Sequence, residues 1–334
     1  MTALRRLLTG ALPLVLLAGS FAAVAPASAV DEPTTEKPTT DEPATEKPAN
    51  VAVPVRVHIS PDRSDTYGVG QLVTVRFSSP IRRKAAVEKA ITVTGSQRLG
   101  AGSWGWINDT TAVYRPRKFW PADTDVTFTF AFKGVVMGRT ESETLIGARD
   151  RTFTLHIGGR FVMSIRDSKH RLYVERDGKT VRSFPVSLGK RKWETLSGIK
   201  ILTGEKYVRL RMVGYDPGEK SRWDVVAPYS IRLTPNGEFI HGAPWAAYRM
   251  GKANGSHGCT NMFPRHAKWL YKRVTPGDPV VTRGTGRPMS TDNGVPGAYW
   301  NYSWRAWRQK SGLTGAPDKV KATSVPPVQR LAGP

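Results

Sequence analysis

The chain contains a single cysteine, Cys259, with a histidine and a glycine directly before it and a second histidine upstream. A thiol becomes a strong nucleophile as its thiolate, which needs a neighbouring base or cation. His257 is two residues before Cys259, and in a turning backbone we expect its side chain to point away from the sulfur. His241 is 18 residues before Cys259 and follows an apolar segment, so it can arrive from a separate strand. The pattern predicts Cys259 as a nucleophile and His241 as its general base.

Gly258 lets the backbone approach a substrate closely and expose N–H groups, as an oxyanion hole requires. We expect a thiolate at Cys259 to be stabilised by an imidazolium beside it. An inert buried cysteine is the alternative, and the histidine and glycine before it in a chain that otherwise avoids cysteine argue against that. A metal site would combine His241, His257, His266 and Cys259, but their spacing matches no common zinc pattern. We predict no metal and no cofactor.

Short apolar segments must position these residues, and they indicate a mixed β block over 158–284. Three of them lie at 160–165, 171–175 and 183–187, with the turn residues Asp177 and Gly178 predicting a hairpin between the last two. Further segments at 198–203, 225–226 and 238–240 lead to the cysteine. The one strongly helical stretch runs from Pro264 to Arg273, with the proline suited to a first helical turn.

A separate strand-rich block precedes this one, over 51–157. Residues alternate between apolar and polar, are rich in β-branched and aromatic types, and are interrupted by turn residues, which is typical of an antiparallel β-sandwich. Its histidines, His58 and His156, lie within predicted strands and are interpreted as structural. The expected strands are 53–59, 72–77, 91–94, 111–114, 126–132 and 152–156.

The ends of the chain have a different composition. Residues 1–29 show two arginines, an apolar stretch and the small-residue tripeptide Ala27-Ser28-Ala29, the layout of a cleaved secretory signal. A membrane anchor is the alternative, but Pro13 interrupts the stretch, and no later segment is apolar enough to span a bilayer. Residues 30–50 hold a repeat of proline, threonine and acids, typical of an extended linker. Five aromatic residues crowd into 299–307, so 285–313 is predicted to dock, and 314–334 to be disordered.

The charge is strongly basic, +23 for 334 residues. Residues 1–50 hold six acidic and four basic residues, so 51–334 carry +25, two more than the whole chain. Such a surface favours anionic surroundings. No nucleic-acid recognition motif is present and the export signal argues against that partner, so we expect anionic cell-wall polymers instead.

The segment Ser256 to Asn261, reading SHGCTN, together with His241-Gly242 upstream, resembles the signature of the L,D-transpeptidases with the YkuD-type catalytic domain. The likeness extends further. The block 158–284 resembles their catalytic domain, 51–157 resembles the immunoglobulin-like domain of the actinobacterial members, and 285–313 resembles their Trp-rich C-terminal extension. The fold expected is therefore mainly β: an immunoglobulin-like sandwich, then a β-rich catalytic domain with a short helix.

The resemblance implies a cysteine acyltransferase, exported to the cell wall or periplasmic space, that acts on peptidoglycan stem peptides and is a target of carbapenems. Cys259 would attack a tetrapeptide stem at its third residue, release D-alanine and pass the acyl group to another stem, giving a 3→3 cross-link. By the same resemblance His241 is the base, and His257 and Gly258 belong to the nucleophile loop. The supporting positions are Gly242, Ser256 and Asn261, with Met212 and Tyr215 as contacts of a flap over 206–222.

Three alternatives stay open at this point. Hydrolysis at the same site would make the protein an L,D-carboxypeptidase. A non-catalytic wall-binding protein would use the sandwich and the aromatic tail, with a vestigial cysteine site. A cysteine peptidase of the NlpC kind is disfavoured, because there the cysteine precedes its histidine in sequence, whereas here His241 precedes Cys259.

Overall fold

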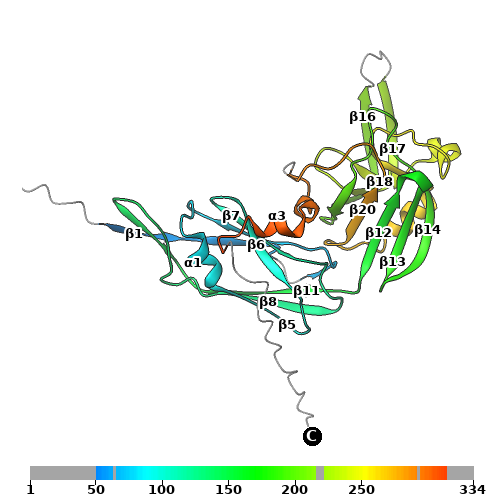
Figure 1. The fold of residues 1–334 in the computed structure, drawn as a ribbon. Helices are drawn as coiled ribbons and strands as arrows, with labels where there is room; N and C mark the ends of the chain where they lie inside the picture. The colour runs from blue at the N-terminus through cyan, green and yellow to red at the C-terminus, as the bar shows by residue number, and fades with distance from the viewer. Residues whose placement is uncertain (1–49, 63–64, 216–221, 292–293, 314–334) are drawn as a thin grey trace, which may run out of the picture. The chain divides into compact units, whose positions relative to one another are not determined.

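A computed structural model describes residues 50–62, 65–215, 222–291 and 294–313. These residues fold as a mainly β structure with a few short helices, which confirms the predicted fold class (Figure 1). The predicted signal 1–29, the linker except for Asn50, and the tail 314–334 lie outside the described residues. Among the helices that the structure describes, none has the length and apolar character that crossing a membrane requires.

The N-terminal block contains strands β1 to β11 and helix α1. Their bounds are β1 (Val51–Val55), β2 (Val57–Ser60), β3 (Thr66–Tyr67), β4 (Val73–Phe77), α1 (Lys84–Lys89), β5 (Ile91–Gly95), β6 (Gly102–Asn108), β7 (Thr111–Pro116), β8 (Thr124–Phe130), β9 (Val136–Arg139), β10 (Glu143–Gly147) and β11 (Arg151–Ile157).

These strands form small sheets in the orders β1-β10-β9, β3-β11-β8-β5 and β2-β4-β7-β6. Most neighbours are antiparallel, as predicted, whereas β1 with β10 and β3 with β11 are parallel. Because side chains alternate between the two faces of β8, Val126, Phe128 and Phe130 all point into a shared aromatic core. The single strand predicted at 53–59 is divided at Arg56, because β1 and β2 belong to different sheets. Helix α1 and the strands β3, β6, β9 and β10 were not predicted from the sequence.

The second block contains β12 to β20, α2 and short 3-10 turns, and the chain ends in η3 and α3. Their bounds are β12 (Phe161–Arg166), η1 (Asp167–Lys169), β13 (Arg171–Arg176), β14 (Lys179–Ser187), β15 (Gly198–Ile201), β16 (Lys206–Tyr215), β17 (Arg222–Arg232), β18 (Phe239–Gly242), η2 (Pro244–Arg249), β19 (Thr260–Met262), α2 (Pro264–Tyr271), β20 (Pro279–Arg283), η3 (Ala298–Asn301) and α3 (Trp304–Arg308).

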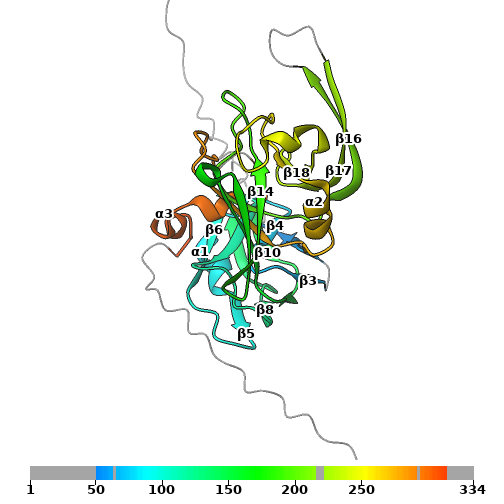
Figure 2. The same ribbon diagram turned by 90° about the vertical axis from the view of Figure 1, so that its right-hand side faces the viewer.

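Within the described residues, nine strands form one sheet in the order β15-β20-β12-β13-β14-β19-β18-β17-β16. The predicted hairpin is confirmed: β13 and β14 pair antiparallel, and Asp177 and Gly178 both have the positive φ that a tight hairpin turn needs. β16 and β17 form a long hairpin that projects beyond the rest of the sheet in both ribbon views (Figures 1 and 2).

Helix α2 lies against β17 and β18, the strands that lead into the cysteine region (Figure 2). Pro264 occupies its first turn, as predicted, and Ala267 and Leu270 are buried one turn apart. The helix ends at Tyr271, two residues earlier than predicted. It therefore packs against the strand that carries His241.

The aromatic extension packs on the N-terminal sandwich. The buried Arg115 side chain donates hydrogen bonds to the carbonyls of Tyr299 and Tyr302, at 2.6 and 3.0 Å. Its guanidinium also lies within 6 Å of the ring centres of three tryptophans: Trp300, Trp304 and Trp307. Trp307 is fully buried and lies over Gly105, where a Cβ atom would come within 2.6 Å of the indole.

Candidate active site

His241 lies on β18, and Cys259 directly precedes β19, the parallel strand that pairs with β18. His241 is opposite Asn261, and partners in a strand pair project to the same side, so these two residues share a face. Cys259 is two residues before Asn261. With a strand spacing of about 4.8 Å and a rise of about 3.3 Å per residue, regular strand geometry extended back to Cys259 gives a separation of roughly 8 Å between its Cα atom and that of His241. An imidazole and a thiol can span such a separation.

His241 is a buried, neutral base. Its Nδ1 lies 2.9 Å from the carbonyl oxygen of Gly242. A carbonyl can only accept, so Nδ1 carries the proton and Nε2 presents a lone pair. Burial lowers the pKa of His241 to about 4, against a smaller opposing effect of that hydrogen bond. The ring of Trp245 stacks at 5.9 Å between centres. The backbone of Gly242 thus orients the imidazole.

Cys259 rests as a thiol. Its Sγ donates to the carbonyl of Gly237 at 3.6 Å. Loss of solvent raises the pKa of Cys259 to about 12, the N–H of Phe239 opposes this, and the carboxylate of Glu238 adds to it. With His241 neutral as well, the resting site holds no thiolate and imidazolium pair. This differs from our expectation, because both groups lose hydration that their charged forms need.

Hydrogen bonds hold the nucleophile loop, residues 256–259, both within the loop and from another segment of the chain. The hydroxyl of Ser256 donates to the carbonyl of Cys259 at 2.6 Å and accepts from the N–H of Gly258 at 3.1 Å. From another segment, the buried Thr195 hydroxyl donates to the carbonyl of Gly258 at 2.8 Å. Gly258 has φ of 118°, a conformation that only glycine adopts easily. Sequence reasoning found Ser256 and Gly258 but missed Thr195, which lies in no motif.

The ring of His257 contacts two tryptophans. Trp223 of β17 stacks on it at 5.1 Å and an interplanar angle of 12°, and Trp193 meets it edge-on at 5.4 Å. Neither tryptophan was predicted as part of the site. Asn261, on the face that it shares with His241, is buried, and its Oδ1 accepts no hydrogen bond from the described residues.

The segment predicted as a flap forms the hairpin of β16 and β17. Met212 is half-buried and pairs with Val225, on the face that also holds Gly214 and Trp223. The indole of Trp223 covers Gly214, where a Cβ atom would lie 2.3 Å away. Met212 therefore lies on the face that carries Trp223 to His257. The side chain of Tyr215 and the hairpin tip, 216–221, are outside the described residues.

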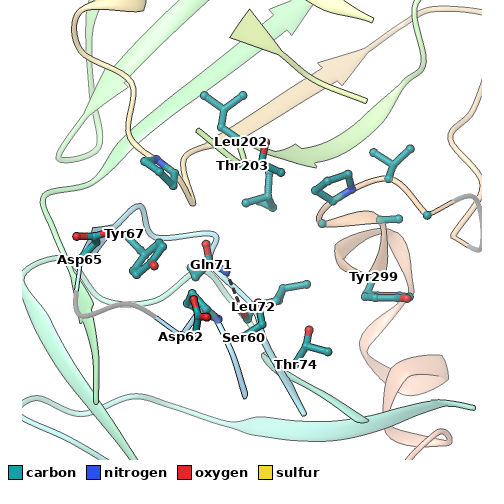
Figure 3. A pocket seen from close by; sticks show the side chains of 18 residues that line it. Ser60, Asp62, Asp65, Tyr67, Gln71, Leu72, Thr74, Leu202, Thr203 and Tyr299 are labelled. Carbon is teal, nitrogen blue, oxygen red and sulfur yellow. Dashed lines mark hydrogen bonds between the residues drawn. The ribbon is translucent and has the colours of Figure 1, made fainter. Parts of the chain in front are cut away.

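No cluster of three or more His, Cys, Asp or Glu side chains that could hold a metal ion occurs in the part of the chain that the structure describes. His266, which the metal hypothesis included, lies on α2 against Phe184, with ring centres 4.7 Å apart. A cavity of about 460 Å³ is lined by residues such as Gln71, Thr203 and Tyr299 (Figure 3). The candidate catalytic residues do not line it, so this cavity is separate from the chemistry.

Comparison with known families agrees with this geometry. The family model of the L,D-transpeptidase catalytic domain, YkuD, matches residues 160–282, and that of a bacterial Ig domain matches residues 23–136. Residues 160–282 belong to the L,D-transpeptidase family. The predicted resemblance to a YkuD catalytic domain and to an immunoglobulin-like domain is thereby confirmed. The L,D-transpeptidase domain contains His241, Cys259 and all the loop residues described above.

Two relatives from Mycobacterium tuberculosis match most of the chain. L,D-transpeptidase 5 is 32% identical over 272 residues, which cover 78% of this chain and 57% of that protein. L,D-transpeptidase 2 is 30% identical over 256 residues, which cover 75% and 61%. The chain thus spans less than two thirds of the length of either relative.

Solved L,D-transpeptidase structures share the fold. One from Mycobacterium smegmatis has a TM-score of 0.55 at 26% identity and covers 70% of this chain and 100% of its own. Another, LdtMt1 in complex with imipenem, has a TM-score of 0.55 at 27% identity and covers 69% and 99%.

Proposed function

We propose that this protein is a peptidoglycan L,D-transpeptidase that forms 3→3 cross-links through an acyl-enzyme on Cys259. The sulfur attacks the carbonyl of the third residue of a tetrapeptide stem, and D-alanine leaves with the amine. The side-chain amine of a second stem then takes the acyl group and frees the sulfur. The observation that carries the proposal is the parallel pairing of β18 with β19, which sets His241 opposite Asn261, two residues from Cys259.

His241 supplies the base for both steps. As the sulfur attacks, its proton passes to Nε2 of His241, while the Gly242 carbonyl holds the Nδ1 proton. The imidazolium so formed returns that proton to the departing amine of D-alanine. In the second step Nε2 takes a proton from the attacking amine and passes it to the departing sulfur of Cys259, which restores the neutral pair. Because the resting pair is neutral, proton transfer accompanies bond formation rather than preceding it.

The nucleophile loop stabilises the oxyanion. The N–H of Gly258 is already bound to the hydroxyl of Ser256. We therefore assign the oxyanion contact to the N–H of Cys259 itself. Ser256 and Asn261 brace the loop, His257 is fixed in it by tryptophans, and Met212 and Tyr215 contact bound substrate from the hairpin.

The protein is proposed to act outside the cytoplasmic membrane. The signal-like segment at 1–29 and the linker at 30–50 support export, and the charge of +25 on 51–334 supports attraction to anionic wall polymers. A related L,D-transpeptidase structure contains imipenem. We propose that carbapenems likewise acylate Cys259.

The test is mass spectrometry of the protein after exposure to a purified tetrapeptide stem. We expect an adduct that lacks D-alanine, and none with Cys259→Ala at unchanged thermal stability. Adding a second stem should convert the adduct into a cross-linked dimer. Products released only by water would indicate the L,D-carboxypeptidase instead. Cross-linking that persists in Cys259→Ala, or a wild-type protein that forms no adduct, would contradict the proposal.

A further inference from the structure

A buried ion pair lies beneath the nucleophile loop, and the mechanism above makes no use of it. Lys200 on β15 is 0% exposed and Glu238, directly before β18, is 6% exposed. The Lys200 Nζ lies 3.6 Å from Oε2 of Glu238. Buried charges are costly, so a pair such as this calls for an explanation beyond stability.

The rest of both side chains is held by neighbouring backbone. Oε1 of Glu238 accepts the N–H of Leu196 at 2.8 Å. Nζ of Lys200 donates to the carbonyl of Leu196 and, at 3.3 Å, to the hydroxyl of Thr282. Oε2 of Glu238 accepts no hydrogen bond among the described residues, so Lys200 is its partner through charge alone.

Glu238 packs against the nucleophile loop directly and is also linked to it through neighbouring residues. A Cβ atom on Gly258 would lie 3.5 Å from both Cγ and Oε1 of Glu238, so the carboxylate packs against that peptide. The neighbours of Glu238 in sequence hold the sulfur, since Gly237 accepts from Sγ and the N–H of Phe239 stabilises its charged form. Through Leu196, Glu238 also fixes the segment whose Thr195 binds the Gly258 carbonyl.

We infer that Glu238, held by Lys200, is a positioning residue whose negative charge beside the nucleophile loop adds to the effect of burial in keeping Cys259 a thiol at rest. This inference rests on the proposed function of Cys259. A negative charge close to a sulfur disfavours the thiolate. The one thiol of the protein is thereby less reactive at rest, while His241 removes its proton during attack. Lys200 and Arg287 act on Glu238 through their charges, His241 lies opposite Asn261, and His257 precedes Cys259 by two residues.

The test measures alkylation of Cys259 by iodoacetamide between pH 7 and 9, which needs no transpeptidase activity. Glu238→Gln should lower the pKa of Cys259, because it removes the charge of Glu238. For each unit by which that pKa falls, the thiolate fraction rises about tenfold and each thiolate becomes about threefold less nucleophilic, so alkylation becomes about threefold faster. Glu88→Gln, which alters another buried carboxyl group in the N-terminal block, is the matched control and should leave the rate unchanged.

Two variants separate charge from packing. Glu238→Asp keeps the charge and shortens the side chain, so it should not speed alkylation. If Glu238→Gln proves unstable, the double variant with Lys200→Met removes both charges and should show the same acceleration. Equal acceleration by Glu238→Asp, or none by Glu238→Gln and the double variant, would overturn the inference. An adduct with the tetrapeptide stem tests the proposed function separately.

Discussion

The resting protonation state of Cys259 makes a quantitative prediction about its reactivity. A free cysteine with a pKa of about 8.5 is about 3% thiolate at pH 7. With the pKa of Cys259 raised to about 12, the thiolate fraction is about 10⁻⁵, roughly 3,000-fold lower. The more basic thiolate is about 40-fold more nucleophilic. Iodoacetamide should therefore alkylate Cys259 about two orders of magnitude more slowly than free cysteine.

The assay follows the mass of the intact wild-type protein during reaction with iodoacetamide from pH 5 to pH 9. Because the protein has one cysteine, each adduct reports on Cys259. The rate should rise about tenfold per pH unit throughout. A resting thiolate and imidazolium pair would instead give a rate that is nearly flat between pH 5 and 8. Such a plateau, or reaction as fast as that of free cysteine, would refute the neutral resting pair.

Acylation by substrate should depend on pH differently, because the proposed mechanism uses His241 as its base. The pKa of His241 is about 4, so the imidazole is neutral at pH 5.5, where a histidine with a pKa of 6.5 would be about 90% protonated. Acylation by the tetrapeptide stem should keep most of its rate at pH 5.5 and fall as the pH approaches 4. A loss centred near pH 6.5 would contradict the burial effect.

Three further predictions concern stability and the loop. Arg115→Met should lower the free energy of unfolding by about 2–4 kcal/mol, because two carbonyls lose their donor and three rings lose a cation. It should also expose 294–313 to proteolysis. Arg117→Met, at an exposed arginine, is the control, and equal effects of both variants would contradict the prediction. Burial raises the pKa of Asp278 to about 7. The contribution of this carboxyl group to the free energy of unfolding is therefore complete below about pH 4 and is lost as the pH rises through 7. Asp278→Asn should thus gain up to about 4 kcal/mol over wild type between pH 4 and 8 in urea titrations, and a constant difference would count against it. Gly258→Ala places a Cβ at φ of 118° and should cost about 1–2 kcal/mol and slow acylation by the stem, whereas an unchanged rate would show that the loop tolerates the residue.

Residues with strong local signals could be predicted from the sequence. The Asp177-Gly178 turn fixed a hairpin, Pro264 marked the start of α2, and alternation located most strands of both blocks. Cys259 and His241 were predicted as a catalytic pair because a lone thiol near histidines has few uses. The pairing of β18 with β19, which sets His241 opposite Asn261, depends on contacts distant in sequence and could not be predicted.

Long-range partners could not be predicted for the same reason. Trp223 and Trp193 reach His257 from segments more than 30 residues away. Nothing in the sequence marks Lys200 and Glu238 as a buried pair, because neither lies in a motif. They come together only when β15 and β18 are in place. The ionic resting state was wrong for a related reason: how much water a pocket excludes is a property of packing, not of spacing.

The anchoring of the aromatic extension constrains how this chain is made. Arg115 donates to carbonyls 184 and 187 residues further along the chain, and Gly105 is covered by Trp307. When only the first block has been synthesised, the Arg115 guanidinium lacks these acceptors and Gly105 lacks the indole that covers it. The sandwich can be finished only when synthesis is nearly complete, so a cut between the two blocks leaves neither fragment whole.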